Sequence, residues 1–397
     1  MTLAFGATLF CTAGFWPGIA AAQSLSTASD GNQQRLIVTP SVRSAYDTNV
    51  LRQNDEGNEP RDNFRVTTGV DIIARRTFGR TAVNVAGTLG YDFNSRYKFL
   101  DRTRIEVGGG LRTPVGAICS VSVDARYDQY QFDLGDVDEI IASTTRQQFY
   151  DVLASCNRSS GFSPLAGLSY SKRSTQAQNV FGSTTLGERV GISYAKPSLG
   201  VISLIGSHSR IRRPGVEDLL GAEDGTEVTQ LQLSLNRNVS PRLSFVAGGG
   251  YVRANPDRAA VETFSGASFN GAVTWAPVPR LVIDAVAKRD ITSQNGINAT
   301  YVIREDYSVG ASWRASQRSR VRMSATRIDR DFAGRGTLPL ATVIGEDSTN
   351  IITAAYTYDT ARIFRFGLSI SKRWRDADVA RYDYKSTVIG ASVGAKF

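Results

Sequence analysis

Side chains that could do chemistry are few and widely spaced in this 397-residue chain. The only histidine is His208, so a Ser-His-Asp arrangement would have a single base, and His208 falls where an alternating segment meets a polar stretch. The sequence holds no His or Cys cluster of the kind that binds metal ions. Gly108–Gly110 and Gly248–Gly250 precede no helix pattern, so they are not phosphate loops. The sequence therefore predicts no enzyme, no metal site and no cofactor.

Two cysteines, Cys119 and Cys156, flank the polar stretch Phe132–Arg146. If the segments on either side of that stretch form a hairpin, the two cysteines lie opposite each other on the same face. An oxidising compartment would favour a cross-strand disulfide, and two free buried thiols are the alternative. In either case we interpret the pair as structural, not catalytic.

Charged side chains recur at every second position of segments about ten residues long. In Thr103–Thr113, for example, Ile105 and Val107 face opposite to Arg104 and Glu106. We assign the following charged residues to the inner face of a barrel: Arg104, Glu106, Arg112, Asp124, Arg126, Asp284, Arg304, Asp306, Arg314, Arg320, Arg322 and Arg365. Arginine outnumbers acidic residues in this set, so a pore lined by them would favour anions. The alternative is that they pair across strands and only solvate the wall.

The elements that would position these residues are antiparallel strands. Period-2 segments predict 18 strands: Leu36–Ala45, Asn63–Arg75, Thr81–Phe93, Thr103–Thr113, Ala117–Gln131, Gln147–Cys156, Leu165–Lys172, Arg189–Ala195, Val201–His208, Glu227–Asn236, Leu243–Arg253, Phe264–Ala276, Leu281–Arg289, Thr300–Trp313, Arg320–Ile328, Asn350–Asp359, Phe364–Trp374 and Tyr384–Phe397. The connections between them alternate short and long, as in barrels with tight periplasmic turns and longer extracellular loops. The predicted fold is an all-β, up-and-down transmembrane barrel.

One face of each strand must meet lipid and the other must meet water. A charged side chain facing hydrocarbon costs about 2–4 kcal/mol near the bilayer centre, and side chains cannot fill a barrel of this size. Aromatic residues at strand ends predict girdles at the two membrane interfaces. They are Tyr91, Phe93, Tyr127, Tyr251, Trp275, Trp313, Tyr356, Tyr358, Trp374, Tyr382 and Tyr384. The sequence leaves open whether a loop such as Asp329–Thr349 folds inward.

Composition and the N-terminal residues predict the cellular location of the protein. The net charge is +9, but the basic residues are spread along the chain, which argues against nucleic-acid binding. Residues 1–22 form an apolar run that ends in Ala20-Ala21-Ala22, the pattern of a cleaved signal peptide. We predict that residues 23–35 form a short periplasmic segment and residues 36–397 the barrel.

Short motifs carry a resemblance to a known family. Leu36–Arg43 followed by Tyr46–Val50, with Gly90–Asp92 and Arg126–Asp128 further along, resembles the outer-membrane β-barrel porin family of the porin 2 type found in Gram-negative bacteria. The last strand ends in Phe397, which resembles the signal that the outer-membrane assembly machinery recognises. The resemblance implies an outer-membrane pore, and the occurrence of some members beside capsule or exopolysaccharide genes suggests glycan export.

We therefore expect a passive pore for polar, anionic solutes. The alternatives are an outer-membrane component of capsule or exopolysaccharide export and a non-conducting structural or adhesive barrel. The expected partners are outer-membrane lipid and lipopolysaccharide, the outer-membrane assembly machinery and, for the export alternative, periplasmic polysaccharide-export proteins. A homo-oligomer is also compatible with the sequence.

Overall fold

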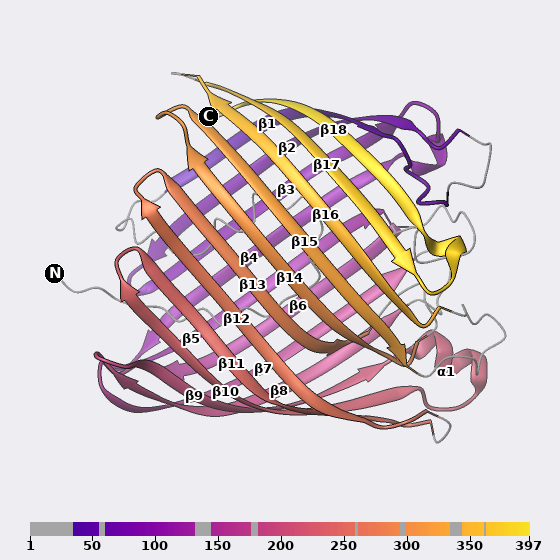
Figure 1. Ribbon diagram of the computed structural model, residues 1–397. Coiled ribbons are helices and arrows are strands. Elements are labelled where there is room, and N and C mark those ends of the chain that lie inside the picture. Colours follow the sequence, from indigo (N-terminus) through magenta and orange to yellow (C-terminus); the bar gives the residue numbers. More distant parts are fainter. Residues whose placement is uncertain are drawn as a thin grey trace.

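In a computed structural model, the chain forms a closed barrel of 18 antiparallel strands (Figure 1). The structure describes residues 35–54, 60–131, 144–175, 182–258, 261–293, 299–333, 344–360 and 363–397. The strands are β1 Arg35–Asp47, β2 Asn63–Phe78, β3 Thr81–Asn94, β4 Arg102–Val115, β5 Cys119–Gln131, β6 Thr144–Cys156, β7 Gly161–Thr175, β8 Ser183–Lys196, β9 Gly200–Arg212, β10 Gly225–Ser240, β11 Leu243–Pro256, β12 Phe264–Val278, β13 Leu281–Thr292, β14 Tyr301–Arg314, β15 Ser319–Ala333, β16 Glu346–Asp359, β17 Phe364–Ala377 and β18 Tyr384–Ala395. The predicted signal peptide, residues 1–22, lies outside the described residues.

Each strand pairs with its neighbours in sequence, and β18 pairs with β1 to close the barrel. The predicted fold class and strand number are confirmed. Most strands extend beyond their predicted bounds, and the extension is mainly at the end that carries the long connections. Strand β8, for example, begins at Ser183, although the alternation begins at Arg189. Apolar and polar side chains must alternate only where one face of the strand meets lipid. The alternating pattern in the sequence therefore ends before the strand does.

Short and long connections alternate along the chain. Eight short ones span two to four residues, and the nine others span six to fifteen. Figure 1 shows the short turns and the C-terminus at one end of the barrel, the turn end, and the short helix α1 (Pro214–Leu220) at the other, the loop end. The loop end also carries the 3-10 turns η2 (Lys98–Leu100) and η5 (Ala380–Tyr382). The predicted sorting of the connections is therefore confirmed.

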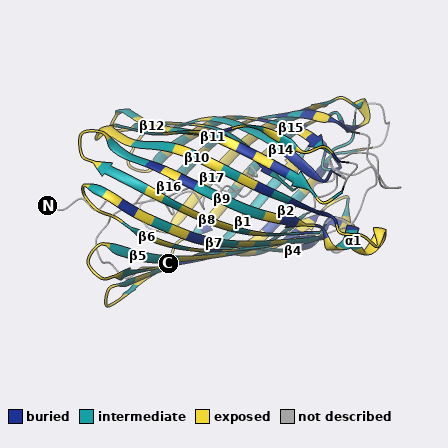
Figure 2. Cartoon of the chain, turned by 90° about the horizontal axis from the view of Figure 1, so that it is seen from below, coloured by how far each residue is buried: buried dark blue, intermediate teal, exposed yellow. Residues whose placement is uncertain are grey.

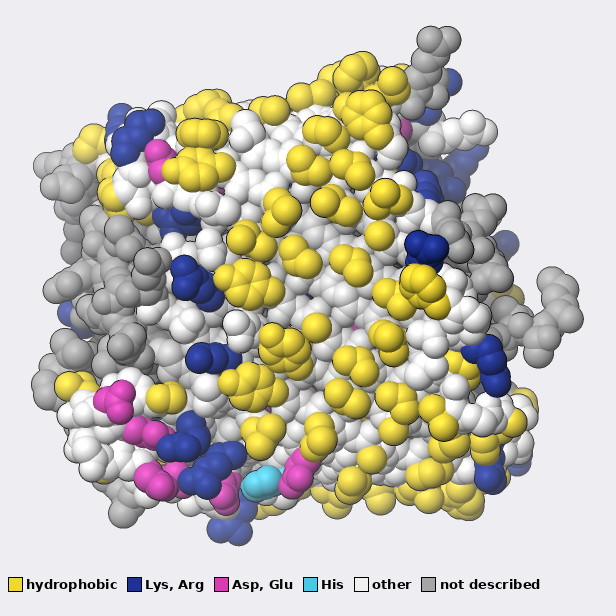
Figure 3. Space-filling view, turned by 180° about the vertical axis from the view of Figure 1, so that it is seen from behind, with side chains coloured by type: hydrophobic (Ala, Val, Ile, Leu, Met, Phe, Trp, Pro, Cys, Tyr) yellow, Lys and Arg dark blue, Asp and Glu magenta, His cyan; other side chains and the backbone are white. Residues whose placement is uncertain are grey.

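Large hydrophobic side chains are exposed on the outer face of the barrel. Leu168, Val190 and Leu368, for example, are 58%, 65% and 60% exposed. Hydrophobic side chains spread over the middle of this surface, while charged side chains gather toward its two ends (Figure 3). A surface of this kind is stable in lipid and would aggregate in water. Among the described residues, no helix is both long enough and apolar enough to cross a bilayer.

Aromatic side chains mark the ends of the apolar belt, with two exceptions. Tyr251, Trp275 and Trp313 are 55%, 47% and 51% exposed on the outer face, as expected for an interfacial girdle. Tyr382 and Tyr384 are only 3% and 4% exposed, so their assignment to the girdle was wrong. Both lie at the loop end, where each packs beneath an arginine: Arg375 over Tyr382 and Arg52 over Tyr384.

Barrel closure depends on contacts at both ends of the seam between β1 and β18. At the turn end, the backbone groups of Val38 and Phe397 exchange two hydrogen bonds, of 3.2 and 2.9 Å. At the loop end, Ser386 donates a hydrogen bond to Asp47 (2.7 Å), and the Asn49 amide donates to the Lys385 carbonyl (3.1 Å). The Tyr46–Val50 motif therefore fastens the first strand to the last.

Candidate functional site: the inner face of the barrel

The register places all twelve predicted charged residues on one face of the sheet. Directly opposed residues of an antiparallel pair share a face, and the pairings connect this face around the closed barrel. It is opposite to the face that carries the exposed hydrophobic side chains, so it is the inner face. That these twelve residues line a conducting pore is still a prediction.

Toward the loop end, the inner charges are paired and largely shielded from water. Arg104 lies 3.6 Å from Asp92, and Arg304 lies 2.7 Å from Asp306. The side chains of the latter pair are 17% and 26% exposed. Arg126 pairs likewise with its strand neighbour Asp128, at 2.7 Å. In this half of the barrel, the arginines are paired with acidic residues along the wall. The structure therefore agrees here with the alternative of paired wall charges and not with a lining of free cations.

The most buried of these ion pairs was not predicted from the sequence. The Asp347 carboxylate is 0% exposed, and it lies 2.6 Å from the Arg330 guanidinium and 2.5 Å from that of Arg375. All three residues lie just beyond the predicted ends of their strands, and all three have the parity of the inner face. Continuing the alternation by one to three residues would have found them.

Toward the turn end, the inner charges are exposed and mostly basic. Of the twelve predicted residues, seven are exposed: Arg112, Asp124, Asp284, Arg314, Arg320, Arg322 and Arg365. Five of the seven are arginines. Arg365 pairs with Asp359 at 2.6 Å, but both side chains remain about half exposed, at 54% and 50%. This half of the inner face therefore presents accessible positive charge.

The described residues of the β13–β14 connection, Ser293, Ala299 and Thr300, contact other strands' residues at the loop end. Ser293, directly after β13, lies with its hydroxyl 3.2 Å from that of Ser183, on the inner face of β8. Arg213, which follows β9, donates hydrogen bonds to the Ala299 carbonyl and to the Thr300 hydroxyl. Strands β8 and β13 are five places apart in the sheet, so Ser293, Ala299 and Thr300 must reach inward at the barrel mouth; these three residues are called the inward β13–β14 segment.

Apolar packing holds both sides of this inward segment. On one side, Ile291 and Tyr301 join a buried cluster with Val228 and Val252, which are inner-face residues of β10 and β11. On the other side, Ala299 and Val302 pack in a second cluster: Ala299, Val302, Phe332, Ile344 and Tyr382. Figure 2 shows that buried residues gather toward the end of the barrel that carries α1. The mouth is therefore partly filled at the loop end.

A buried carboxylate also fixes this packing. Asp224 is 0% exposed and lies 2.6 Å from the Arg213 guanidinium and 2.9 Å from that of Arg258. Burial lowers the pKa of Arg213, and its hydrogen bond to Asp224 opposes that shift. An arginine remains charged in proteins, so Arg213 and Asp224 form a buried ion pair at the loop end.

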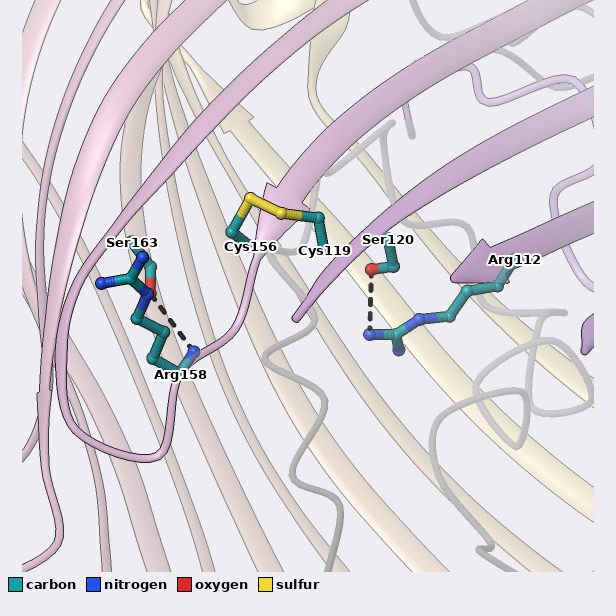
Figure 4. The surroundings of a disulfide bond; sticks show 6 residues. All are labelled: Arg112, Cys119, Ser120, Cys156, Arg158 and Ser163. Atoms are coloured by element: carbon teal, nitrogen blue, oxygen red, sulfur yellow. Dashed lines mark hydrogen bonds between the residues drawn. A yellow bond between two sulfur atoms is a disulfide. The ribbon is translucent and has the colours of Figure 1, made fainter. Parts of the chain in front are cut away.

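The remaining candidate residues lie away from the lumen. Cys119 and Cys156 are directly opposed on β5 and β6 and form a disulfide at the turn end (Figure 4). Their parity is that of the outer face. The His208 ring lies 3.2 Å from the Thr229 hydroxyl, and Glu188 is opposite it on the same outer face. Within the described ranges, no group of three or more His, Cys, Asp or Glu side chains could hold a metal ion.

Comparison with known proteins agrees with the barrel assignment. Residues 236–397 match the family model described as "Putative beta-barrel porin 2". The match confirms the resemblance to that family, although the N-terminal motifs that suggested it lie outside the matched residues. The chain is a transmembrane β-barrel of the outer membrane, and its residues 236–397 are similar to this porin family. Its turn end is therefore periplasmic and its loop end extracellular.

Solved structures with similar chain traces are distant in sequence. They include Pseudomonas aeruginosa OccK2 (OpdF), with a TM-score of 0.47, 11% identity and coverage of 91% of this chain and 98% of that chain. Pseudomonas aeruginosa OpdK with vanillate has a TM-score of 0.47, 12% identity and coverage of 91% and 99%. The siderophore receptor PirA from Pseudomonas aeruginosa has a TM-score of 0.42, 10% identity and coverage of 92% and 80%. No curated protein matches the sequence.

Proposed function

We propose that the barrel is a passive pore for polar solutes and that it favours anions. One observation carries this proposal: among the residues predicted to line the lumen, the exposed charges of the periplasmic half comprise five arginines against the two aspartates Asp124 and Asp284, and one of the five, Arg365, pairs with a further aspartate, Asp359. Rings of basic side chains favour anion passage. Solutes would diffuse down their own gradient, with no covalent step and no bound cofactor.

The two halves of the inner face would contribute differently to transport. In the extracellular half, paired charges such as Arg304–Asp306 give a polar wall with little net field. There the inward β13–β14 segment limits the size of solutes. In the periplasmic half, exposed guanidinium groups raise the local anion concentration. This attraction acts over about 8–10 Å at physiological ionic strength, so selectivity should weaken as salt concentration rises.

Planar bilayers test this proposal. The full-length barrel, refolded from purified protein, should give discrete conductance steps. Swelling of barrel-containing liposomes in solutions of neutral sugars and organic acids of matched size should be faster with the acids. A folded barrel that gives no conductance would favour a structural or adhesive role. A barrel that passes neutral oligosaccharides as readily as small acids would favour glycan export.

A further inference from the structure

Three arginines meet on the inner face where β14 turns into β15. Arg314 is directly opposite Arg320 in the β14–β15 register, and Arg322 is the next inner-face residue along β15. The β-carbons of a directly opposed pair lie about 4.5–5.5 Å apart, and like charges in such positions destabilise a sheet. All three side chains are exposed. The Arg314 and Arg320 side chains are therefore close enough for both guanidinium groups to contact the same anion.

No carboxylate neutralises the opposed pair. Across the described residues, the guanidinium groups of Arg314 and Arg320 form no ion pair and no hydrogen bond. The acids on the adjoining strands have other partners. Asp284 on β13 accepts a hydrogen bond from Thr274 at 3.0 Å and its charge acts on Arg322, outside the opposed pair, while Asp359 on β16 pairs with Arg365. The positive charge of the pair is therefore available to a solute.

We propose that Arg314, Arg320 and Arg322 form a binding site for a multiply charged oxyanion at the periplasmic mouth. This inference rests on the proposed pore function and names its solute class. Guanidinium groups suit this ligand because their planar donors match two oxygens of one phosphate or carboxylate group. A bound oxyanion would also relieve the repulsion between the two opposed arginines.

The site lies at the periplasmic end of the barrel, so the effect of a bound anion on current should depend on the side from which the anion is added. Arg314 is the last residue of β14, and Arg320 is the second residue of β15, so both flank the periplasmic turn at 315–318. An anion that arrives from the periplasm meets them first. An anion that arrives from outside must first pass the inward β13–β14 segment at the other end. A multiply charged anion should therefore block current more strongly from the periplasmic side.

The test adds inorganic pyrophosphate to one side of a bilayer that holds the barrel in a chloride electrolyte. Pyrophosphate on the periplasmic side should reduce the current in a saturable way, and the same concentration on the other side should have a much smaller effect. Arg320→Gln and Arg314→Gln should each weaken the block by about tenfold, because each removes a charge-assisted contact. Arg237→Gln is the matched control: Arg237 is an exposed residue near the periplasmic end of β10, and its register with Phe245 places it on the outer face. It should leave the block within about twofold of wild type.

A second measurement does not depend on conduction. Pyrophosphate should raise the unfolding temperature of the wild-type barrel in detergent, but not that of Arg314→Gln/Arg320→Gln. The double variant should fold, since it loses a like-charge contact. A conducting wild-type barrel with no block and no shift in unfolding temperature would overturn the site and leave the pore intact. A barrel that never conducts would overturn the pore, and the unfolding shift would then decide whether the site exists.

Discussion

Replacement of Asp347 by Asn should destabilise the barrel far more than the same change at Asp359. Both aspartates are inner-face residues of β16, and each pairs with arginine. The Asp347 side chain is 0% exposed and contacts two arginines whose side chains are 9% and 2% exposed. Its loss leaves two cations in a site that water does not reach. Removal of one partner of a buried ion pair costs about 3–5 kcal/mol.

Asp359 is the matched control at the periplasmic end of the same strand. It forms one ion pair with Arg365, and the two side chains are 50% and 54% exposed. Water can solvate both groups after the pair is broken, so Asp359→Asn should cost only about 0–1 kcal/mol.

Equilibrium unfolding of the refolded barrel in urea, followed by tryptophan fluorescence, gives both free energies of unfolding. The wild type and the two variants should be compared in the same detergent and at the same pH. A cost for Asp347→Asn within about 1 kcal/mol of that for Asp359→Asn would contradict the argument from burial.

Three further predictions concern the extracellular end and the seam. Cysteines in place of Ser183 and Ser293 should form a disulfide under oxidising conditions, because the two hydroxyl oxygens lie 3.2 Å apart; mass spectrometry that finds both new thiols free would place the β13–β14 segment elsewhere. The Arg212 hydrogen bond lowers the pKa of Glu217, so the stabilisation it gives to α1 should be present at neutral pH and lost as pH falls through that lowered pKa. Hydrogen exchange at the α1 amides should therefore speed up on acidification, and Glu217→Gln should remove most of that pH dependence. Asn49→Ala should cost about 1–3 kcal/mol in urea unfolding, since its amide bonds a carbonyl on β18; a change near zero would mean that the β1–β18 ladder alone closes the barrel.

The sequence predicts those parts of the fold that the membrane itself imposes. Alternation along β4 placed Arg104, Glu106 and Arg112 on one face, and the register keeps them together. A lipid bilayer penalises the wrong parity, so the pattern is strong wherever the strand crosses it. Beyond the bilayer that penalty disappears, which explains why Asp347 and its two arginines fell outside the predicted strands.

Contacts between distant segments could not be predicted from the pattern. Nothing in the residues around Ser183 and Ser293 indicates that they meet, because they lie 110 positions apart and on strands that are not neighbours. The same holds for Tyr382, whose place at a predicted strand end suggested a membrane girdle. It is instead buried against Phe332 at the end of β15 and Ile344 just before β16. Such packing brings together residues that are far apart in the sequence, and local periodicity does not encode it.

Anion selectivity is the central claim, and the reversal potential across a salt gradient tests it most directly. With potassium chloride at two concentrations on the two sides of a bilayer, the wild-type barrel should give a potential whose sign indicates that chloride passes more readily than potassium. Its size should fall as the mean salt concentration rises, because salt screens the exposed arginines. A reversal potential of the opposite sign, or one that Arg314→Gln/Arg320→Gln leaves unchanged, would contradict the account.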